Sequence, residues 1–549
     1  MTRFAVGQSL AGVYARGGVV WLAVDDNGAA RAARGGAVRV GLARDPVTDP
    51  AVSFDWTLHY ATCAMLLNYP DRPGTAGTRL QPEIAMTMPR ISADGRTYTF
   101  RIRPGYRFSP PSGEPVTART FKVTLERALS PRLGENAPAF HYVSDIVGAR
   151  AYRAGRARHL AGVSTRGDRL IIRLIRPAGD FPARIAMPLF CAVPTSTPVE
   201  RNGIKTPIPS AGPYYLASHQ HGRELVLKRN PSYAGPRPHR LDEIKLVVGV
   251  GTDEAVASVQ RGSLDYYRLD IPDLFLAAFQ PGGRYALAFG PDTARAGRAR
   301  PRYLLTPSPF VRALALNTSR PLFRDPEMRR AVSFAIDRRA LAAVFGAEPT
   351  DQYLPRLTPG FHAMDLYPLD APDLGKARTL VHGHRHRADL WTCGGVVCRG
   401  VAEIVRRNLR PIGIDVVIRQ YDDWDVRASN LGARYDIFDL AFYVDYADPA
   451  AVLEPLLSGD SIEATGNTNV AYLHDRALDA RLRRAARLTG PERLAAYGAI
   501  DGDVARDSAP MAAFANDNIG EFLSARVGCE VFQPVYAGVS LAALCVREN

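Results

Sequence analysis

The sequence predicts an α/β protein with mixed sheets, divided into about two or three domains. Strand-like and helix-like segments alternate along the whole chain, which is typical of this fold class. The 549 residues are too many for one hydrophobic core, because single cores stop growing at roughly 250–300 residues. The hydrophobic content of 46% and the charged content of 23% are ordinary for a globular protein.

The first half of the chain combines short strands with capped helices. Residues 1–36 are rich in Gly, Ala and Arg around one apolar run, 19–24, for which we expect a single strand followed by a linker. We expect further strands at 38–42, 98–102, 169–175, 225–228 and 244–248. We expect helices at 55–67, 119–129 and 253–261. Thr117 is placed to cap the second helix, and Gly262 to end the third.

Longer helices are expected in the second half. Pro326 follows Asp325, and proline and acidic residues both favour the first turn of a helix, so we expect a helix from Pro326 to about Phe345. We expect two further helices and one strand, at 397–409, 491–507 and 414–419. Short extended segments are expected after the last helix.

The basic charge of the chain does not indicate a nucleic-acid partner. The formal net charge is +14, but the arginines are spread from Arg3 to Arg547 and alternate with acidic residues. A nucleic-acid binder gathers such charge into a stripe or tail. The densest cluster, 295–302, lies in a Gly/Pro/Ala-rich segment without aromatic residues on which bases stack.

Motifs of catalysis and cofactor binding are absent from the sequence. It contains no nucleophile elbow, zinc-protease motif, phosphate-binding loop or dinucleotide fingerprint, so we expect neither an enzyme nor a cofactor. His382, His384 and His386 alternate and would share one face of a strand. No acid or cysteine is placed to complete a metal site with them, and we expect no metal.

Compartment signals are mixed. No stretch of about 20 apolar residues is present, and the first ten residues lack the pattern of a secretion signal. The chain has six cysteines, an even number that permits three disulfides or six free thiols. Cys393 and Cys398, and also Cys529 and Cys545, are close enough in sequence to pair locally.

Several sequence blocks, in order, resemble those of bacterial extracellular solute-binding protein family 5, which includes the oligopeptide-, dipeptide- and nickel-binding proteins of ABC importers. The blocks are residues 80–85 with 92–103 and 108–118, 209–216 with 227–233, 259–265, 316–318 with 323–338, 409–416, and 445–449. The resemblance covers roughly 37–549. One departure is Thr120, where the family usually has an acid.

The resemblance implies a two-lobed periplasmic-binding-protein fold with an extra peripheral subdomain, mixed sheets and a hinge between the lobes. Lobe I would hold residues 37–312 and 514–549, with the subdomain at about 69–188. Lobe II would hold 313–513, and residues 1–36 would be an N-terminal extension or linker.

The resemblance also implies which residues contact a ligand. Asp445 matches the family aspartate that binds the amino terminus of a peptide, and a charge-assisted hydrogen bond suits that role. The alternative for Asp445, and the favoured reading of Asp448, is a cap for the helix after Pro449. Phe442 stands where relatives often have tryptophan.

Aromatic and polar residues elsewhere complete the expected ligand site. The further candidates are Tyr443, Tyr446, Ser53, Phe54, Asp55, Trp56, Trp391 and Trp424. Core packing is an equally open role for Tyr443 and Tyr446.

The resemblance implies the solute-binding protein of an ABC-type importer, which captures peptides or similarly sized solutes. Its partners would be the solute and a membrane permease, and it would act as a monomer outside the cytoplasm, in the periplasm or at the cell surface. The alternative is an intracellular ligand-sensing module of a longer regulatory protein. The absence of a visible signal peptide keeps a cytoplasmic location open.

Overall fold

The computed structural model describes residues 9–16, 19–25, 34–134, 137–269, 289, 302–381 and 385–547. Within them the chain forms two compact units. The first unit holds residues up to 306 and from 519 onward, and the second unit holds 307–518. The chain passes from one unit to the other inside β14 (Arg302–Leu316) and again inside β19 (Met511–Leu523). The sequence predicts these passages after 312 and after 513.

The main sheet of the first unit has the strand order β10-β11-β12-β3-β13-β19. The strand bounds are β10 Tyr214–Gln220, β11 Glu224–Arg229, β12 Glu243–Val248, β3 Ala37–Leu42 and β13 Tyr266–Leu269. Strand β3 runs parallel to both neighbours, and residues 520–523 of β19 pair antiparallel with β13. Alternate apolar residues, such as Val38 and Val40, face one buried core, because side chains on a strand alternate between its two faces.

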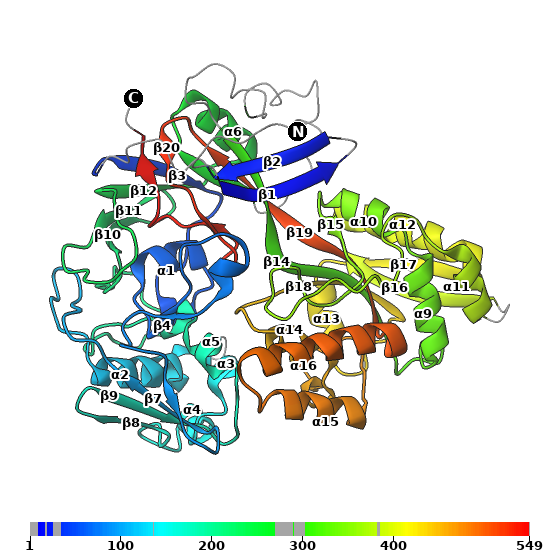
Figure 1. Cartoon of the computed structure of the whole chain (residues 1–549), viewed down its shortest axis with the longest axis horizontal. Coiled ribbons are helices and arrows are strands. Elements are labelled where there is room, and N and C mark those ends of the chain that lie inside the picture. The colour runs from blue at the N-terminus through cyan, green and yellow to red at the C-terminus, as the bar shows by residue number, and fades with distance from the viewer. Residues whose placement is uncertain are drawn as a thin grey trace. The chain divides into compact units, whose positions relative to one another are not determined.

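A second sheet of the first unit lies within 69–188. Its order is β6 (Arg90–Ile91), β7 (Thr97–Arg101), β9 (Arg169–Arg173) and β8 (Val163–Arg166). Helix α2 (Ala118–Ala128) packs on β8 and β9 (Figure 1). Thr117 accepts the amide of Thr120, and Thr120 accepts the amide of Thr117 in return. Thr120 therefore completes the capping box, at the position where the family resemblance leads us to expect an acid.

The sheet of the second unit has the order β14-β18-β16-β17. Strand β16 (His386–Cys393) is parallel to β17 (Ile414–Tyr421) and to β18 (Ile437–Tyr443), and β18 is antiparallel to β14. Helix α12 (Val396–Leu409) joins β16 to β17 and buries Val401, Ala402, Val405 and Leu409 at helical spacing. Strand β15 (Glu348–Pro349) pairs with β19.

The other α-helices and strands of the described residues belong to one unit each. In the first unit they are α1 Trp56–Thr62, β4 Leu67–Asn68, β5 Gln81–Pro82, α3 Ala139–Val143, α4 Ala149–Arg153, α5 Phe181–Ile185, α6 Thr252–Arg261, β20 Val527–Gly528, β21 Phe532–Gln533, β22 Gly538–Val539 and β23 Cys545–Val546. In the second unit they are α9 Pro326–Ala335, α10 Arg338–Val344, α11 Leu374–Val381, α13 Trp424–Ala428, α14 Ala450–Leu457, α15 Arg476–Ala485 and α16 Gly490–Asp503. None of the helices in the described part of the chain is long and apolar enough to cross a membrane.

The fold class is the predicted one, α/β with mixed sheets, but the expected helix from Pro326 to Phe345 was wrong. It is two helices, because Ile336 takes an extended conformation with ψ of 138°. Asp337 then caps α10 by accepting the amide of Ala340 at 2.8 Å. Arg338 is fully buried and donates to the carbonyls of Thr350 and Ala513. The break thus directs a buried arginine toward main-chain acceptors.

Three other expectations need correction. The helix expected at 55–67 ends at Thr62, because Cys63 is extended. The segments after the last helix include β19, a buried strand of 13 residues, where only short segments were expected. The single strand expected at 19–24 is half of a hairpin, in which β2 (Val19–Asp25) pairs with β1 (Ser9–Arg16). His382, His384 and most of the 295–302 cluster lie outside the described residues.

All six cysteines form disulfides. The two local pairs suggested by the sequence, Cys393–Cys398 and Cys529–Cys545, are confirmed. Cys63 and Cys191, 128 residues apart, form the third, with a Cα–Cα distance of 5.3 Å. In a chain-entropy view, closing so long a loop in the unfolded chain favours the folded state by about 5 kcal/mol.

The N-terminal hairpin is expected to be dispensable for folding of the body. Strands β1 and β2 form a separate two-stranded sheet, whereas Gly35 and Gly36 bond to the main chain of Arg240 and the carboxylate of Asp242. A chain that begins at Arg34 keeps those bonds. Its melting temperature should lie within about 2 °C of that of the full chain, because β1 and β2 pair with each other and with no other described strand. A drop of about 10 °C in calorimetry would contradict this.

Candidate ligand-binding site

The carboxyl ends of three parallel strands meet at one edge of the second-unit sheet. Cys393 of β16 is opposite Tyr421 of β17, and β18 ends near them at Tyr443. In open α/β sheets, ligands bind outside the carboxyl ends of the strands. We call this the carboxyl edge.

Three half-buried aromatic residues, Trp391, Tyr421 and Trp424, lie near the carboxyl edge, and Trp391 also contacts the buried Tyr435. The ring of Trp391 meets that of Tyr421 edge-on at 5.1 Å between centroids, and that of Tyr435 at 5.4 Å. Trp424, at the start of α13, donates its indole N–H to the carbonyl of Asp439 at 3.3 Å. The structure therefore places Trp391 and Trp424, two candidates from the sequence, on neighbouring elements of one unit.

Sequence reasoning missed a buried acid on β18. Asp439 accepts the hydroxyl of Thr392 at 2.8 Å. Burial raises the pKa of Asp439 above its ordinary value, although Thr392 and Arg312 act in the opposite direction. The available signal was an acidic residue between Phe438 and Leu440, inside an otherwise apolar strand. The hydrogen bond from Thr392 to Asp439 therefore links β16 to β18 near this edge.

The loop after β18 carries the central candidate. Phe442 and Tyr443 end the strand opposite Val311 and Phe310 of β14, and both side chains are half-buried. Asp445 follows in the loop and is also half-buried, whereas Tyr446 is buried. The segment therefore presents two aromatic side chains and a carboxylate directly beyond a strand end.

Asp448, in the same loop, has a structural role. Its carboxylate receives two hydrogen bonds from Arg493, at 3.1 and 2.9 Å, and both side chains are largely buried. It also accepts the amide of Ala450 at 2.9 Å, at the start of α14, as the sequence suggested for this residue. This pair fixes the loop that presents Asp445.

The candidates in the first unit differ in how accessible they are. The hydroxyl of Ser53 is buried and bonds to the carboxylate of Asp55, which also accepts the amide of Val47 at 2.7 Å. Trp56 is buried and packs near Tyr536. Phe54 is 49% exposed and meets Trp56 edge-on at 5.3 Å. Of these four residues, Phe54 offers the most side-chain surface, and the others order the turn that holds it.

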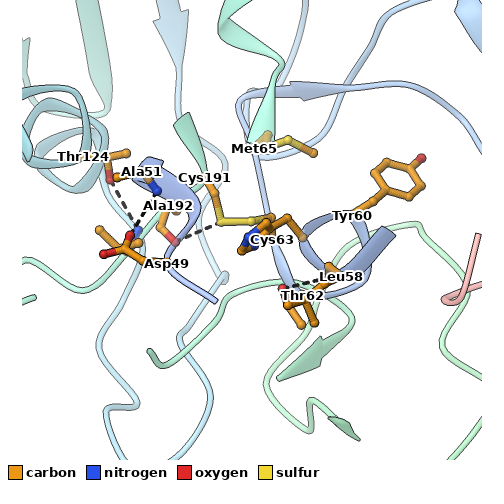
Figure 2. Close-up of a disulfide and its surroundings, with 12 residues drawn as sticks. Asp49, Ala51, Leu58, Tyr60, Thr62, Cys63, Met65, Thr124, Cys191 and Ala192 are labelled. Carbon is orange, nitrogen blue, oxygen red and sulfur yellow. Dashed lines mark hydrogen bonds between the residues drawn. A yellow bond between two sulfur atoms is a disulfide. The ribbon is translucent and has the colours of Figure 1, made fainter. Parts of the chain in front are cut away.

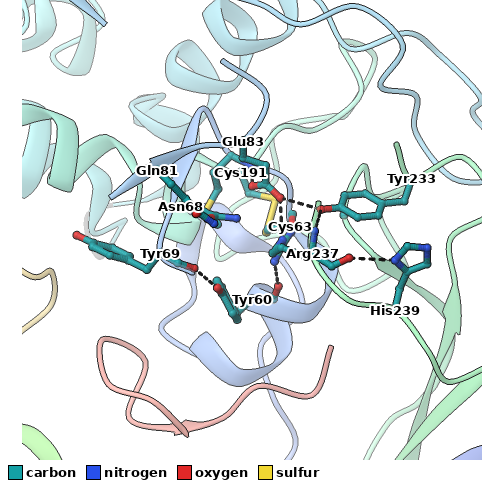
Figure 3. Close-up of polar contacts among 12 residues, drawn as sticks. Tyr60, Cys63, Asn68, Tyr69, Gln81, Glu83, Cys191, Tyr233, Arg237 and His239 are labelled. Atoms are coloured by element: carbon teal, nitrogen blue, oxygen red, sulfur yellow. Dashed lines mark hydrogen bonds and ion pairs between the residues drawn. A yellow bond between two sulfur atoms is a disulfide. The ribbon is translucent and has the colours of Figure 1, made fainter. Parts of the chain in front are cut away.

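A buried ion pair anchors α1, the helix that follows this turn. Arg237 donates to Glu83 at 2.7 Å and to the carbonyls of Tyr60 and Cys63, at the end of α1 (Figure 3). Glu83 also accepts the amide of Met65 at 2.9 Å and the hydroxyl of Tyr233 at 3.3 Å. The last carbonyls of a helix have no partner within the helix, and here the guanidinium of Arg237 donates hydrogen bonds to such carbonyls.

The Cys63–Cys191 disulfide fixes the end of α1 from another side. Figure 2 shows the bond beside Asp49, Thr62 and Met65. Next to it, the amide of Ala192 bonds to the carbonyl of Ala64 at 3.0 Å. Asp49 is buried and paired with Arg127. Burial raises the pKa of Asp49, but Arg127 and two main-chain amides bring it below the ordinary value.

Comparison with known proteins gives the class of this protein. The profile of the bacterial extracellular solute-binding proteins, family 5, matches residues 79–464. The chain belongs to this family. The family is one of solute-binding proteins without catalytic activity, and it acts outside the cytoplasm.

Individual relatives agree with this assignment. The chain is 23% identical to the dipeptide-binding protein DppE of Bacillus subtilis, over 71% of this chain and 72% of DppE. Among solved structures, it resembles clavulanic acid biosynthesis oligopeptide binding protein 2, with a TM-score of 0.82, 25% identity, and coverage of 94% of this chain and 96% of that one. It also resembles the unliganded murein tripeptide binding protein MppA, with a TM-score of 0.74, 20% identity, and coverage of 94% and 98%.

These likenesses confirm the periplasmic-binding-protein fold predicted from the sequence. They support the expected function, the solute-binding protein of an ABC-type importer. They give no support to the alternative, an intracellular sensing module.

Replacing Asp448 by Asn should destabilise the second unit without changing its shape. Arg493 would keep its buried charge and lose its carboxylate partner, which costs roughly 3–5 kcal/mol. Denaturant unfolding measures this loss. The matched control is Asp460→Asn, at the exposed pair with Arg483, where the loss should be about 1 kcal/mol or less. Equal losses for the two variants would contradict the structural role of Asp448.

Proposed function

We propose that this protein captures short peptides and delivers them to the membrane permease of an ABC-type importer. The observation that carries the proposal is the carboxyl edge of the second unit, where aromatic side chains and the Asp445 loop follow the ends of parallel strands. The relatives described as dipeptide- and oligopeptide-binding proteins support the choice of ligand.

Asp445 is the residue to which we assign the ligand's positive group. It stands directly after β18, and its half-buried carboxylate matches the family position that binds a peptide amine. A bound ligand removes water from such a carboxylate, and that loss is offset when the ligand supplies an ammonium group.

Aromatic side chains would contact the rest of the ligand. Trp391, Trp424, Phe442 and Tyr443 are half-buried, so they combine fixed packing with an accessible face. Within the first unit, Phe54 stays the exposed aromatic candidate. Broad aromatic surfaces accept varied side chains, which suits a protein that takes many short peptides.

The remaining roles follow from the same proposal. The protein would act outside the cytoplasm, and its three disulfides support an oxidising compartment. It would bind its ligand as a monomer and without catalysis, and it would have no nucleic-acid partner. The scattered arginines, many of them paired with acidic residues, support that last statement.

The Asp445→Asn variant tests the assigned role. It keeps the shape of the side chain and removes its charge, so affinity for a free peptide should fall by roughly 2–5 kcal/mol, as for a buried charge left without its partner. Denaturant unfolding of the same variant separates a loss of affinity from a loss of stability. Calorimetric titration with short peptides measures the affinities of the wild type and of the Asp445→Asn variant. Asp415→Asn, on an exposed site at the other end of β17, is the matched control and should bind like the wild type.

The chemistry of the ligand gives a second arm of the same test. Acetylating the peptide's amino terminus removes the charge that Asp445 would bind. Wild-type affinity should then drop, while the Asp445→Asn variant should show little further loss. If acetylated and free peptides bind the wild type equally well, Asp445 does not hold the amine.

A further inference from the structure

Three metal-ligating side chains meet on the first unit, outside the residues assigned to the ligand. Asp45 lies in the segment between β3 and α1, and His219 and His221 flank the end of β10. Nε2 of His219 lies 2.8 Å from Oδ1 of Asp45, and Nδ1 of His221 lies 2.7 Å from Oδ2. These donor atoms all lie within 4.8 Å of one another.

Two of the three side chains in this cluster are largely buried, and the third is exposed to solvent. The side chains of Asp45 and His219 are 14% and 9% exposed, whereas that of His221 is 85% exposed. The amide of Gly222 donates to Oδ2 of Asp45 at 2.7 Å and so orients the carboxylate.

We propose that Asp45, His219 and His221 bind a divalent transition-metal ion such as zinc. Two imidazoles and a carboxylate are donors that zinc, cobalt and nickel accept, and solvent on the exposed side would supply further ligands. Zinc lies about 2.0–2.2 Å from such donors, which places tetrahedral donors about 3.3 Å apart. The two nitrogens lie 2.8 and 2.7 Å from the carboxylate oxygens, and the three donor atoms lie within 4.8 Å of one another, so modest side-chain shifts would admit the ion.

The arrangement differs from an ordinary histidine–acid pair. Each oxygen of one carboxylate faces a different imidazole, and the two imidazoles come from alternate residues of one chain segment. By contrast, Glu126 pairs at 3.2 Å with a single imidazole, that of the exposed His159. Within the described residues, Asp45, His219 and His221 form the one group of three such donors.

A bound ion would link two segments of the first unit that lie far apart in the sequence. Asp45 and His219 are 174 residues apart in sequence. Asp45 stands on the segment that leads to Ser53 and α1, and the histidines stand on the turn between β10 and β11. The ion would thus stabilise the folded state over the unfolded one, because a preformed site does not exist in the unfolded chain.

The test uses the full chain, free of any affinity tag and stripped with a chelator. Zn²⁺ titrated in a calorimeter should bind at one equivalent and raise the melting temperature. His221→Ala removes an exposed side chain and should weaken zinc binding at least tenfold, without lowering the melting temperature of the metal-free protein. Asp45→Asn should weaken it as well. The matched control, His159→Ala, should bind zinc like the wild type.

Two results would overturn the proposal. One is a wild-type protein that binds no zinc at micromolar concentrations. The other is a His221→Ala variant that keeps the wild-type affinity, which would place any bound zinc elsewhere, for instance on His382, His384 and His386. Peptide binding by the same variants is independent of this test, so its outcome leaves the proposed function untouched.

Discussion

The buried ion pair of Arg237 and Glu83 is the interaction on which the first unit depends. The guanidinium of Arg237 donates to two carbonyls at the end of α1. The carboxylate of Glu83 accepts the amide of Met65. A buried charge is strongly destabilising without its partner, so loss of either residue should destabilise the contact between these segments. The Cys63–Cys191 disulfide then fixes the same helix end covalently. As a result, the helix that directly follows Phe54 is fixed at its carboxyl end.

The second unit positions its candidate site through different interactions. Parallel strands bring Trp391, Tyr421 and the end of β18 to one edge, and hydrogen bonds to Asp439 join that edge. The Asp448–Arg493 pair then fixes the following loop. Asp448 thereby stabilises the fold through a partner within the protein. The role of Asp445, three residues earlier in the same loop, is a proposal.

Much of the fold could be predicted because it depends on local signals. Thr117 and Gly262 mark helix ends by their own chemistry, and the local disulfides follow from short spacing. Contacts between distant residues could not be predicted. The break before Arg338 depends on carbonyls of Thr350 and Ala513, and the Asp45 cluster depends on histidines 174 residues away. Asp445 was found through family resemblance, and its role stays a prediction.

The central claim, that the ligand is a peptide, is tested most directly by native mass spectrometry of the protein purified gently from cells fed a peptide mixture. The account predicts a population heavier by the mass of a short peptide, and fragment spectra of the released ligand should show losses of amino-acid residues. Capture of a ligand without peptide bonds, with no peptide bound under the same conditions, would contradict it.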